Sequence, residues 1–193
     1  MTASSSSSAL IKDLALQEHP EGALPLPITH TLKDKVASPF ANGKPRELAS
    51  SIYYMLTYDR GVGLFHMNKS VTYHVLHQGR AEYTLITPGN PPTIEKKIMG
   101  TNTAAGETRL LVVGTGIWKR SSLLDEDIRR ATTPAQKDNV NCLITEVVVP
   151  GFDWEDHVYM YKEQLDRLFE GVQGGEKFVR EFAPYVSQNG TAK

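Results

Sequence analysis

The sequence predicts a mainly β fold, a sandwich or barrel of short strands with helices at the two ends of the chain. Many short runs rich in Val, Ile, Thr and Tyr alternate with Gly, Pro and Asn turn signals, which is typical of such folds. An apolar run at residues 141–149 has the composition of a strand buried on both faces. A length of 193 residues without an internal repeat suits a single domain.

The composition disfavours several functional classes. Hydrophobic residues make up 40% and charged residues 22%, as in ordinary globular proteins. A net charge of −1 and the lack of a Lys/Arg block indicate no nucleic-acid partner. No apolar run approaches the roughly 18 residues of a membrane helix, and the N-terminus lacks the pattern of a secretory signal. The single Cys142 cannot form an internal disulfide. We therefore expect a cytoplasmic protein without a membrane partner.

The first quarter of the chain is polar and punctuated by prolines. Residues 1–8 are rich in serine and predict a disordered tail. Residues 8–17 predict an amphipathic helix that Ser8 could cap. Prolines in residues 23–31 exclude a helix and allow an edge strand or an extended segment. Residues 32–48 carry Asn-Gly and Pro breakers and are expected to form a loop.

The middle of the chain alternates strands and turns. We expect strands at residues 51–57, 64–68, 71–77, 81–87, 93–99, 108–113, 117–120 and 141–149. Residues 125–138 are charged and predict a surface loop or a short helix. Helices are expected at residues 161–169 and 176–182, separated by two glycines. A barrel domain would then cover residues 9–160, and residues 161–193 would form a helical segment packed on it.

The stretch from 65 to 79 holds three of the six histidines and contains the candidate site residues of two consecutive predicted strands. Side chains alternate between the faces of a strand, so Thr72 and His74 share one face. His66 and Asn68 share a face of the preceding strand. A hairpin would bring all four side chains together.

The same stretch resembles the first cupin motif, G-x5-H-x-H-x3,4-E-x6-G, with its opening glycine displaced by one position. The positions of the two histidines, the glutamate and the closing glycine are held by His66, Asn68, Thr72 and Gly79. Residues 114–119 resemble the second motif, P-x-G-x2-H, and Lys119 takes the place of its histidine. Imidazole and carboxylate donors hold the usual cupin metal. Only one of the four ligand types is therefore kept.

Two further segments resemble the small RmlC-like cupin family of largely unknown function, which has a member in budding yeast. Residues 52–57 read I-Y-Y-M-L-T, similar to I-Y-Y-x-L-T, and residues 150–156 read P-G-F-D-W-E-D, similar to P-G-F-D-F-E-D. The resemblance covers about residues 10–160. It implies a double-stranded β-helix, or jelly roll, that is commonly dimeric. Where the family has a polar segment, residues 23–28 are apolar, which favours an apolar ligand.

Four side chains are candidates for catalysis. His66 and His74 could transfer a proton, because imidazole titrates near neutral pH. Lys119 could bind an anion, stabilise an enolate or act as a base, or it could instead pair with Glu146. Either Tyr54 or its neighbour Tyr53 points inward, and the resemblance implies a tyrosine that assists a histidine, as in related epimerases.

Other side chains could bind the substrate. Asn68 and Thr72 could orient a carbonyl or hydroxyl group, or be polar fillers. Trp118 could stack on a ring or belong to the core. Glu146 lies in an apolar run, where a carboxylate needs a partner or takes a raised pKa. The candidate binding residues are Asn68, Thr72, Tyr53, Trp118 and Glu146.

The sequence thus predicts a metal-independent cupin enzyme without a cofactor, acting on a small, largely apolar organic molecule as a homodimer. The reaction would be an isomerisation, dehydration or cyclisation. One alternative is a dioxygenase or isomerase with a divalent transition metal at His66, assisted by His74 and Glu146. Another is a small-molecule-binding cupin without chemistry.

Overall fold

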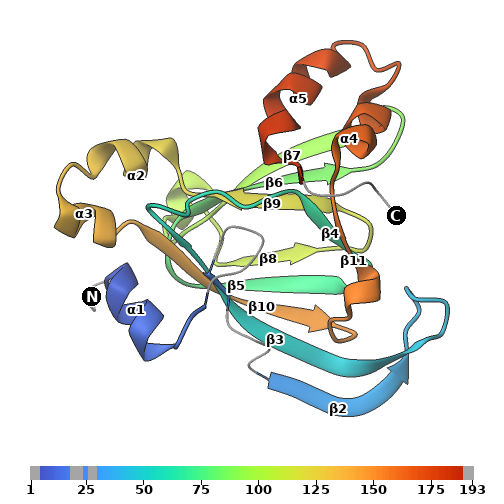
Figure 1. Cartoon of the computed structure of the whole chain (residues 1–193), viewed down its shortest axis with the longest axis horizontal. Helices are drawn as coiled ribbons and strands as arrows, with labels where there is room; N and C mark the ends of the chain where they lie inside the picture. Colours follow the sequence, from blue (N-terminus) through green and yellow to red (C-terminus); the bar gives the residue numbers. More distant parts are fainter. Residues whose placement is uncertain (1–4, 18–23, 26–29, 189–193) are drawn as a thin grey trace.

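Two antiparallel sheets form the body of the molecule in the computed structural model, which describes residues 5–17, 24–25 and 30–188 (Figure 1). The first sheet has the order β1-β3-β10-β5-β8, with β2 also paired to β3. The second has the order β11-β4-β9-β6-β7. Helices lie at the periphery, so the predicted mainly β jelly roll with flanking helices is confirmed.

The strands of the first sheet are β1 (Leu24–Pro25), β2 (His30–Ala37), β3 (Pro45–Thr57), β5 (Val71–Gly79), β8 (Leu110–Val113) and β10 (Asn141–Val149). Those of the second are β4 (His66–Asn68), β6 (Ala81–Thr87), β7 (Thr93–Met99), β9 (Trp118–Ser122) and β11 (His157–Tyr159). The α-helices are α1 (Ser7–Asp13), α2 (Asp125–Arg130), α3 (Pro134–Asp138), α4 (Lys162–Phe169) and α5 (Gly175–Phe182). Three 3-10 turns complete the described elements: η1 (Thr103–Ala105), η2 (Trp154–Asp156) and η3 (Ala183–Tyr185).

Three strands, β6, β7 and β10, begin and end where the sequence predicts. The other predicted strands and helices are present with shifted ends. Strong β-forming runs bounded by Gly and Pro explain the agreement, since both signals are local.

The predicted loop at residues 32–48 was wrong. Most of it belongs to a hairpin in which β2 pairs with the first half of β3, from His30 opposite Ser51 to Ala37 opposite Pro45. Most β2 side chains are exposed, so the strand lacks the apolar alternation that would reveal it. The strand β11 was also missed, because three residues are too few for a pattern.

The predicted hairpin between the segments of His66 and His74 was wrong too. Strand β4 pairs with β9 and β11, whereas β5 pairs with β10 and β8. The chain turns at Lys69 and Ser70 from one sheet to the other, and Lys69 donates its backbone N–H to the Asp156 carbonyl. The two strands therefore lie in opposite sheets.

The predicted disordered tail at residues 1–8 was wrong at its end, because Ser7 and Ser8 belong to a helix. Helix α1 begins at Ser7, and the Ser6 side chain, not that of Ser8, accepts the capping hydrogen bond from the Ala9 N–H. Ser8 instead donates to Asp138 of α3 through its hydroxyl, at 2.6 Å. The first four residues of the expected tail fall outside the described residues, as does most of the proline-rich segment.

Two large apolar clusters make up most of the core, and a small third cluster of Leu16, Met55 and Leu143 lies beside α1. One fills the space between the sheets and includes Tyr54, Leu56, Leu76, Tyr83 and Ile144. The other joins the second sheet to the C-terminal helices and contains Phe65, Ile86, Trp118, Met160, Leu165, Phe169, Phe182 and Val186. In Figure 1 the red helices α4 and α5 lie beside β6 and β7. None of the described helices is long and apolar enough to cross a membrane.

Candidate functional site

A polar cluster lies inside the barrel, where both sheets contribute side chains. Thr72 and His74 come from β5, Glu146 from β10, and Lys119 from β9 of the opposite sheet. The register pairs Glu146 with His74, which puts both side chains on the inner face. All four are buried, with exposed fractions of 1% for Lys119 and Thr72, 2% for His74 and 8% for Glu146.

Lys119 contacts each of the other three side chains of this cluster. Its ammonium Nζ lies 2.5 Å from Glu146 Oε1, 2.9 Å from Thr72 Oγ1 and 3.2 Å from His74 Nε2. The ion pair that the sequence left open as an alternative is therefore present. Because an ammonium only donates, His74 Nε2 must accept, and the neutral ring carries its proton on Nδ1. That Nδ1 lies 3.3 Å from the Tyr83 hydroxyl.

The burial of the cluster shifts two pKa values strongly. Desolvation, helped by the Lys119 charge, lowers the pKa of His74 to about 3, so its imidazole is neutral at physiological pH. Burial alone would raise the pKa of Glu146, but the charge of Lys119 outweighs it and lowers the pKa to about 2. The cluster thus holds one ammonium, one carboxylate and one neutral imidazole.

Hydroxyl groups extend the cluster across the barrel. Tyr83 hydrogen bonds to the Ser121 side chain, and Tyr54 lies 3.2 Å from the Ser121 hydroxyl. Burial raises the pKa of Tyr83 well above its usual value, so its phenol stays protonated. The row of hydrogen bonds from Lys119 to Tyr54 could transfer protons or hold Lys119 in place. Tyr83 and Ser121 were missed, although strand parity could have put Tyr83 on the inner face with Ala81 and Leu85.

His66 and Asn68 stand beside the cluster on β4. The Cα of His66 pairs with that of Lys119, so the two side chains share the inner face of the second sheet. His66 Nδ1 lies 3.0 Å from the Leu64 carbonyl oxygen, which can only accept; the neutral ring therefore accepts protons at Nε2. His157 Nδ1 lies 2.9 Å from Asn68 Oδ1, and its ring centroid is 5.3 Å from that of His66.

Two predicted binding residues face elsewhere. Trp118 packs in the cluster below the C-terminal helices, because neighbours along a strand point to opposite faces and Lys119 points inward. Tyr53 packs beside α1 and lies 5.6 Å from the ring of His77, whereas Tyr54 points inward. The prediction that only one of the two tyrosines faces the interior is confirmed.

The inner residues fit a divalent metal poorly. The described residues include no group of three or more His, Cys, Asp or Glu side chains arranged to hold a metal ion. At the motif positions Asn68, Thr72 and Lys119 replace ligands, and the Lys119 ammonium already bonds to Glu146 and His74. A metal bound there would lie beside the Lys119 ammonium, whose positive charge opposes binding.

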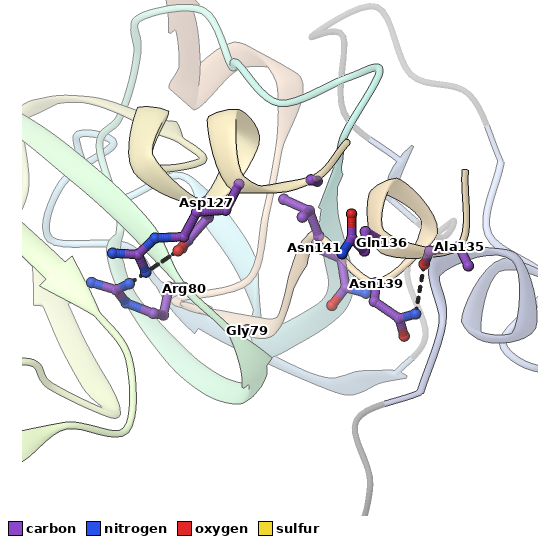
Figure 2. A pocket seen from close by; sticks show the side chains of 10 residues that line it. Gly79, Arg80, Asp127, Ala135, Gln136, Asn139 and Asn141 are labelled. Atoms are coloured by element: carbon purple, nitrogen blue, oxygen red, sulfur yellow. Dashed lines mark hydrogen bonds and ion pairs between the residues drawn. The ribbon is translucent and has the colours of Figure 1, made fainter. Parts of the chain in front are cut away.

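A separate cavity of about 520 Å³ lies between helices α2 and α3 and the Gly79 end of β5 (Figure 2). Arg80, which lines it, is bonded to Glu107, Glu126 and Asp127, so carboxylates already balance its charge. The cavity is lined by Gly79, Arg80, Asp127, Arg130, Ala131, Ala135, Gln136, Asn139, Val140 and Asn141. None of these residues belongs to the Lys119 cluster.

Comparison with known proteins identifies relatives of the whole barrel. Residues 8–160 match the family model described as Cupin superfamily (DUF985). The chain is 33% identical over 166 residues to an uncharacterized protein of Saccharomyces cerevisiae, covering 82% of this chain and 77% of that protein.

Two solved structures are similar in fold. A hypothetical protein from Leishmania major superposes with a TM-score of 0.74 at 21% identity, covering 93% of this chain and 99% of that one. The protein SO0799 from Shewanella oneidensis superposes with a TM-score of 0.70 at 21% identity, covering 95% and 98% of the two chains. At this identity they support the fold and carry no function.

Proposed function

The chain belongs to the Cupin superfamily (DUF985) family, and from this premise we propose that it is a metal-independent enzyme that moves a proton on a small, largely apolar organic molecule. The buried Lys119–Glu146 pair carries the proposal. It puts the Lys119 ammonium, whose charge Glu146 balances, on the inner face beside His66, at a position where the motif has a metal ligand. A fixed charge can stabilise the anion that proton removal creates.

His66 is the proposed base. Its Nε2 would take a proton from a carbon next to a carbonyl group. The C–H electron pair would form a C=C bond, and the carbonyl oxygen would become an enolate. Asn68 would donate to that oxygen, because its Oδ1 faces His157 and leaves the amide nitrogen as donor. Lys119 would donate a hydrogen bond to the same oxygen, while Glu146 would still balance the Lys119 charge.

Three reactions could follow from one enolate. If the substrate carries a β,γ C=C bond, the enolate is a dienolate, and protonated His66 can return the proton to its γ-carbon, which completes an isomerisation. If it gives the proton to a hydroxyl group on the β-carbon, water leaves, the carbonyl re-forms and the reaction is a dehydration. An enolate held next to an electrophile in one conformer could also close a ring.

His74 has a different proposed role from His66. A group with a pKa of about 3 is a weak base at neutral pH, so His74 would hold Lys119 and Tyr83 in position instead of carrying the proton. Lys119 already makes three hydrogen bonds. A substrate oxygen would therefore replace a neutral acceptor, the Thr72 hydroxyl, and leave the Glu146 pair intact.

The test is exchange of carbon-bound hydrogen in D2O, followed by proton NMR with 4-phenyl-2-butanone, 4-cyclohexyl-2-butanone and 4-hydroxy-2-butanone as probes. The wild-type protein should accelerate exchange next to the carbonyl. His66→Gln should reduce the acceleration by about 100-fold or more, the usual contribution of a general base. The matched control is His77→Gln, since His77 is exposed on the outer face of β5.

The same experiment separates the alternatives. Equal exchange rates for the wild type and His66→Gln would contradict the proposed base. Loss of exchange with EDTA, restored by Mn²⁺ or Fe²⁺, would favour the metal-dependent reading. Tight retention of a small molecule without exchange or conversion would favour a binding protein.

We also propose a homodimer that forms through the outer face of the first sheet. Exposed apolar side chains gather there on three adjacent strands, with Tyr73 opposite Val112 and Val75 opposite Leu110. Strand β8, which carries Leu110 and Val112, ends the sheet order. Exposed apolar edges of this kind favour association, and a second copy would cover them.

A further inference from the structure

A row of aromatic rings leads from the molecular surface to His66, and we propose that it binds a planar, aromatic ring of the substrate. The row is made of Trp154, Phe152, His157 and Tyr159, and is called here the ring lip. The inference rests on the proposed function, because it concerns the substrate of that same site. It adds a chemical class, an aromatic ring next to the reacting carbonyl group.

Trp154 is the outermost ring and is 62% exposed, the largest exposed fraction among the exposed large apolar side chains of the described residues. Its indole meets Phe152 at a centroid distance of 5.0 Å and an angle of 84°, and His157 at 5.6 Å and 88°. These edge-to-face contacts fix the indole plane. A fixed and exposed indole is suited to stack on a flat ligand, since little side-chain freedom remains to be lost.

The turn that carries Trp154 is held rigidly from below. Asp156, 4% exposed, accepts from Arg46 Nε at 2.7 Å and from Lys69 Nζ at 3.1 Å. Glu155 bonds to Lys44 and Arg46, and the Asp153 side chain accepts from the Glu155 N–H. The acidic residues next to Trp154 thus hold the turn η2 in place, which fixes the backbone that carries the indole.

The ring lip continues to the proposed catalytic residues. His157 lies 4.9 Å from Tyr159 and 5.3 Å from His66 between ring centroids, and it orients Asn68 by a hydrogen bond. A ring seated on Trp154 and His157 would therefore hold its attached carbonyl group near Asn68 and His66. His157 is in this reading a positioning residue that serves both the ring and the oxyanion donor.

The test measures binding of two matched ketones, 4-phenyl-2-butanone and 4-cyclohexyl-2-butanone, by NMR titration of the full chain. They differ in the aromaticity of a six-membered ring. The phenyl ketone should bind about fivefold more tightly to the wild type, the scale of an aromatic pair beyond its area. Trp154→Ala should abolish this preference, and Trp154→Phe should keep part of it. Val62→Ala, at a 42% exposed apolar residue outside the ring lip, should leave the preference unchanged.

Three results would overturn the inference: equal affinities in the wild type, a preference that survives Trp154→Ala, or no binding of the phenyl ketone at its solubility limit. The binding readout is independent of turnover. A Trp154-dependent preference together with unchanged hydrogen exchange in His66→Gln would keep the ring site and reject the proposed chemistry. His66-dependent exchange without ring preference would do the reverse.

Discussion

At the residue scale, one substitution changes the chemistry of the barrel interior. Where the cupin motif has a histidine, Lys119 carries a fixed positive charge into the space between the sheets. Burying that charge is costly unless it is paired, and Glu146 is the partner that makes it tolerable. The sequence left this pair open as one alternative, because a buried lysine and a buried carboxylate each need a partner.

We expect Lys119→Met alone to destabilise the protein by about 3–5 kcal/mol, because it leaves the buried Glu146 carboxylate unpaired. Lys119→Met combined with Glu146→Leu should recover most of that loss. Urea unfolding of both single variants and of the double variant measures the coupling free energy. Additive effects of the two substitutions would show that the pair is not coupled.

The low pKa of His74 predicts stability that depends on pH. In the folded protein the pKa is about 3 and the usual value is 6.5, so between these values the unfolded chain binds the additional proton. The contribution of His74 to the free energy of unfolding is therefore complete above pH 6.5 and is lost as the pH falls. Between pH 6.5 and 4.5 the loss should reach about 2–3 kcal/mol, before Glu146 adds its own loss at lower pH.

Urea unfolding at several pH values checks this prediction. His74→Gln should flatten the stability profile between pH 6.5 and 4.5. His77→Gln should flatten it less, because the lowered pKa of His77 comes from partial burial near the surface. A profile that keeps its full slope in His74→Gln would contradict the assignment.

At the element scale, turns determine how the strands meet. Gly79 ends β5 with φ +80°, and a Cβ there would overlap the carbonyl oxygen of Asn141 at the start of β10. Gly116 also has a positive φ, +70°, but a Cβ there would meet nothing within 4 Å. A substitution at Gly116 therefore measures the cost of the backbone conformation alone, and one at Gly79 adds the cost of the close approach to β10.

Gly116→Ala should cost about 1–2 kcal/mol, the usual penalty of a left-handed backbone for a residue with a Cβ. Gly79→Ala should cost clearly more, because the backbones of β5 and β10 must also move apart. Thermal unfolding of the two variants side by side measures the difference. Equal losses of stability in the two variants would mean that β5 and β10 can move apart at Gly79 without an energetic cost.

Elements differ in how well the sequence reveals them. The strands β6, β7 and β10 were predicted from end to end, since turn residues flank each of them. The strand β2 was missed because its exposed side chains resemble those of a loop, and only pairing with β3 makes it a strand. Local composition cannot report a strand whose side chains are mostly exposed and which is stabilised by pairing with the next strand.

At the scale of the whole molecule, the outer face of the first sheet predicts association. Leu110 and Val112 are 51% and 48% exposed on β8. The double substitution Leu110→Lys and Val112→Lys should convert a dimer into a monomer, because like charges would face each other across a symmetric contact. Native mass spectrometry and light scattering report the mass.

Lys33→Ala combined with Lys35→Ala on β2 serves as the control and should leave the mass unchanged. A wild-type protein that is monomeric at high micromolar concentration would contradict the proposed interface.

The sequence by itself determined the fold class, the single barrel with its flanking helices, and the loss of the motif's ligand types. These depend on local patterns and residue chemistry, which a chain carries wherever it folds. Strand parity also put Thr72 and His74 on one face, as the structure has them.

Only the tertiary structure decided which strands face each other. It put β4 and β5 in opposite sheets, brought Lys119 against Glu146 and His74, and added Tyr83, Ser121 and His157 to the site. It also turned Trp118 and Tyr53 away from the interior. Pairings between segments far apart in the chain create these contacts and the desolvation that shifts the pKa of His74, and neither has a local pattern to reveal it.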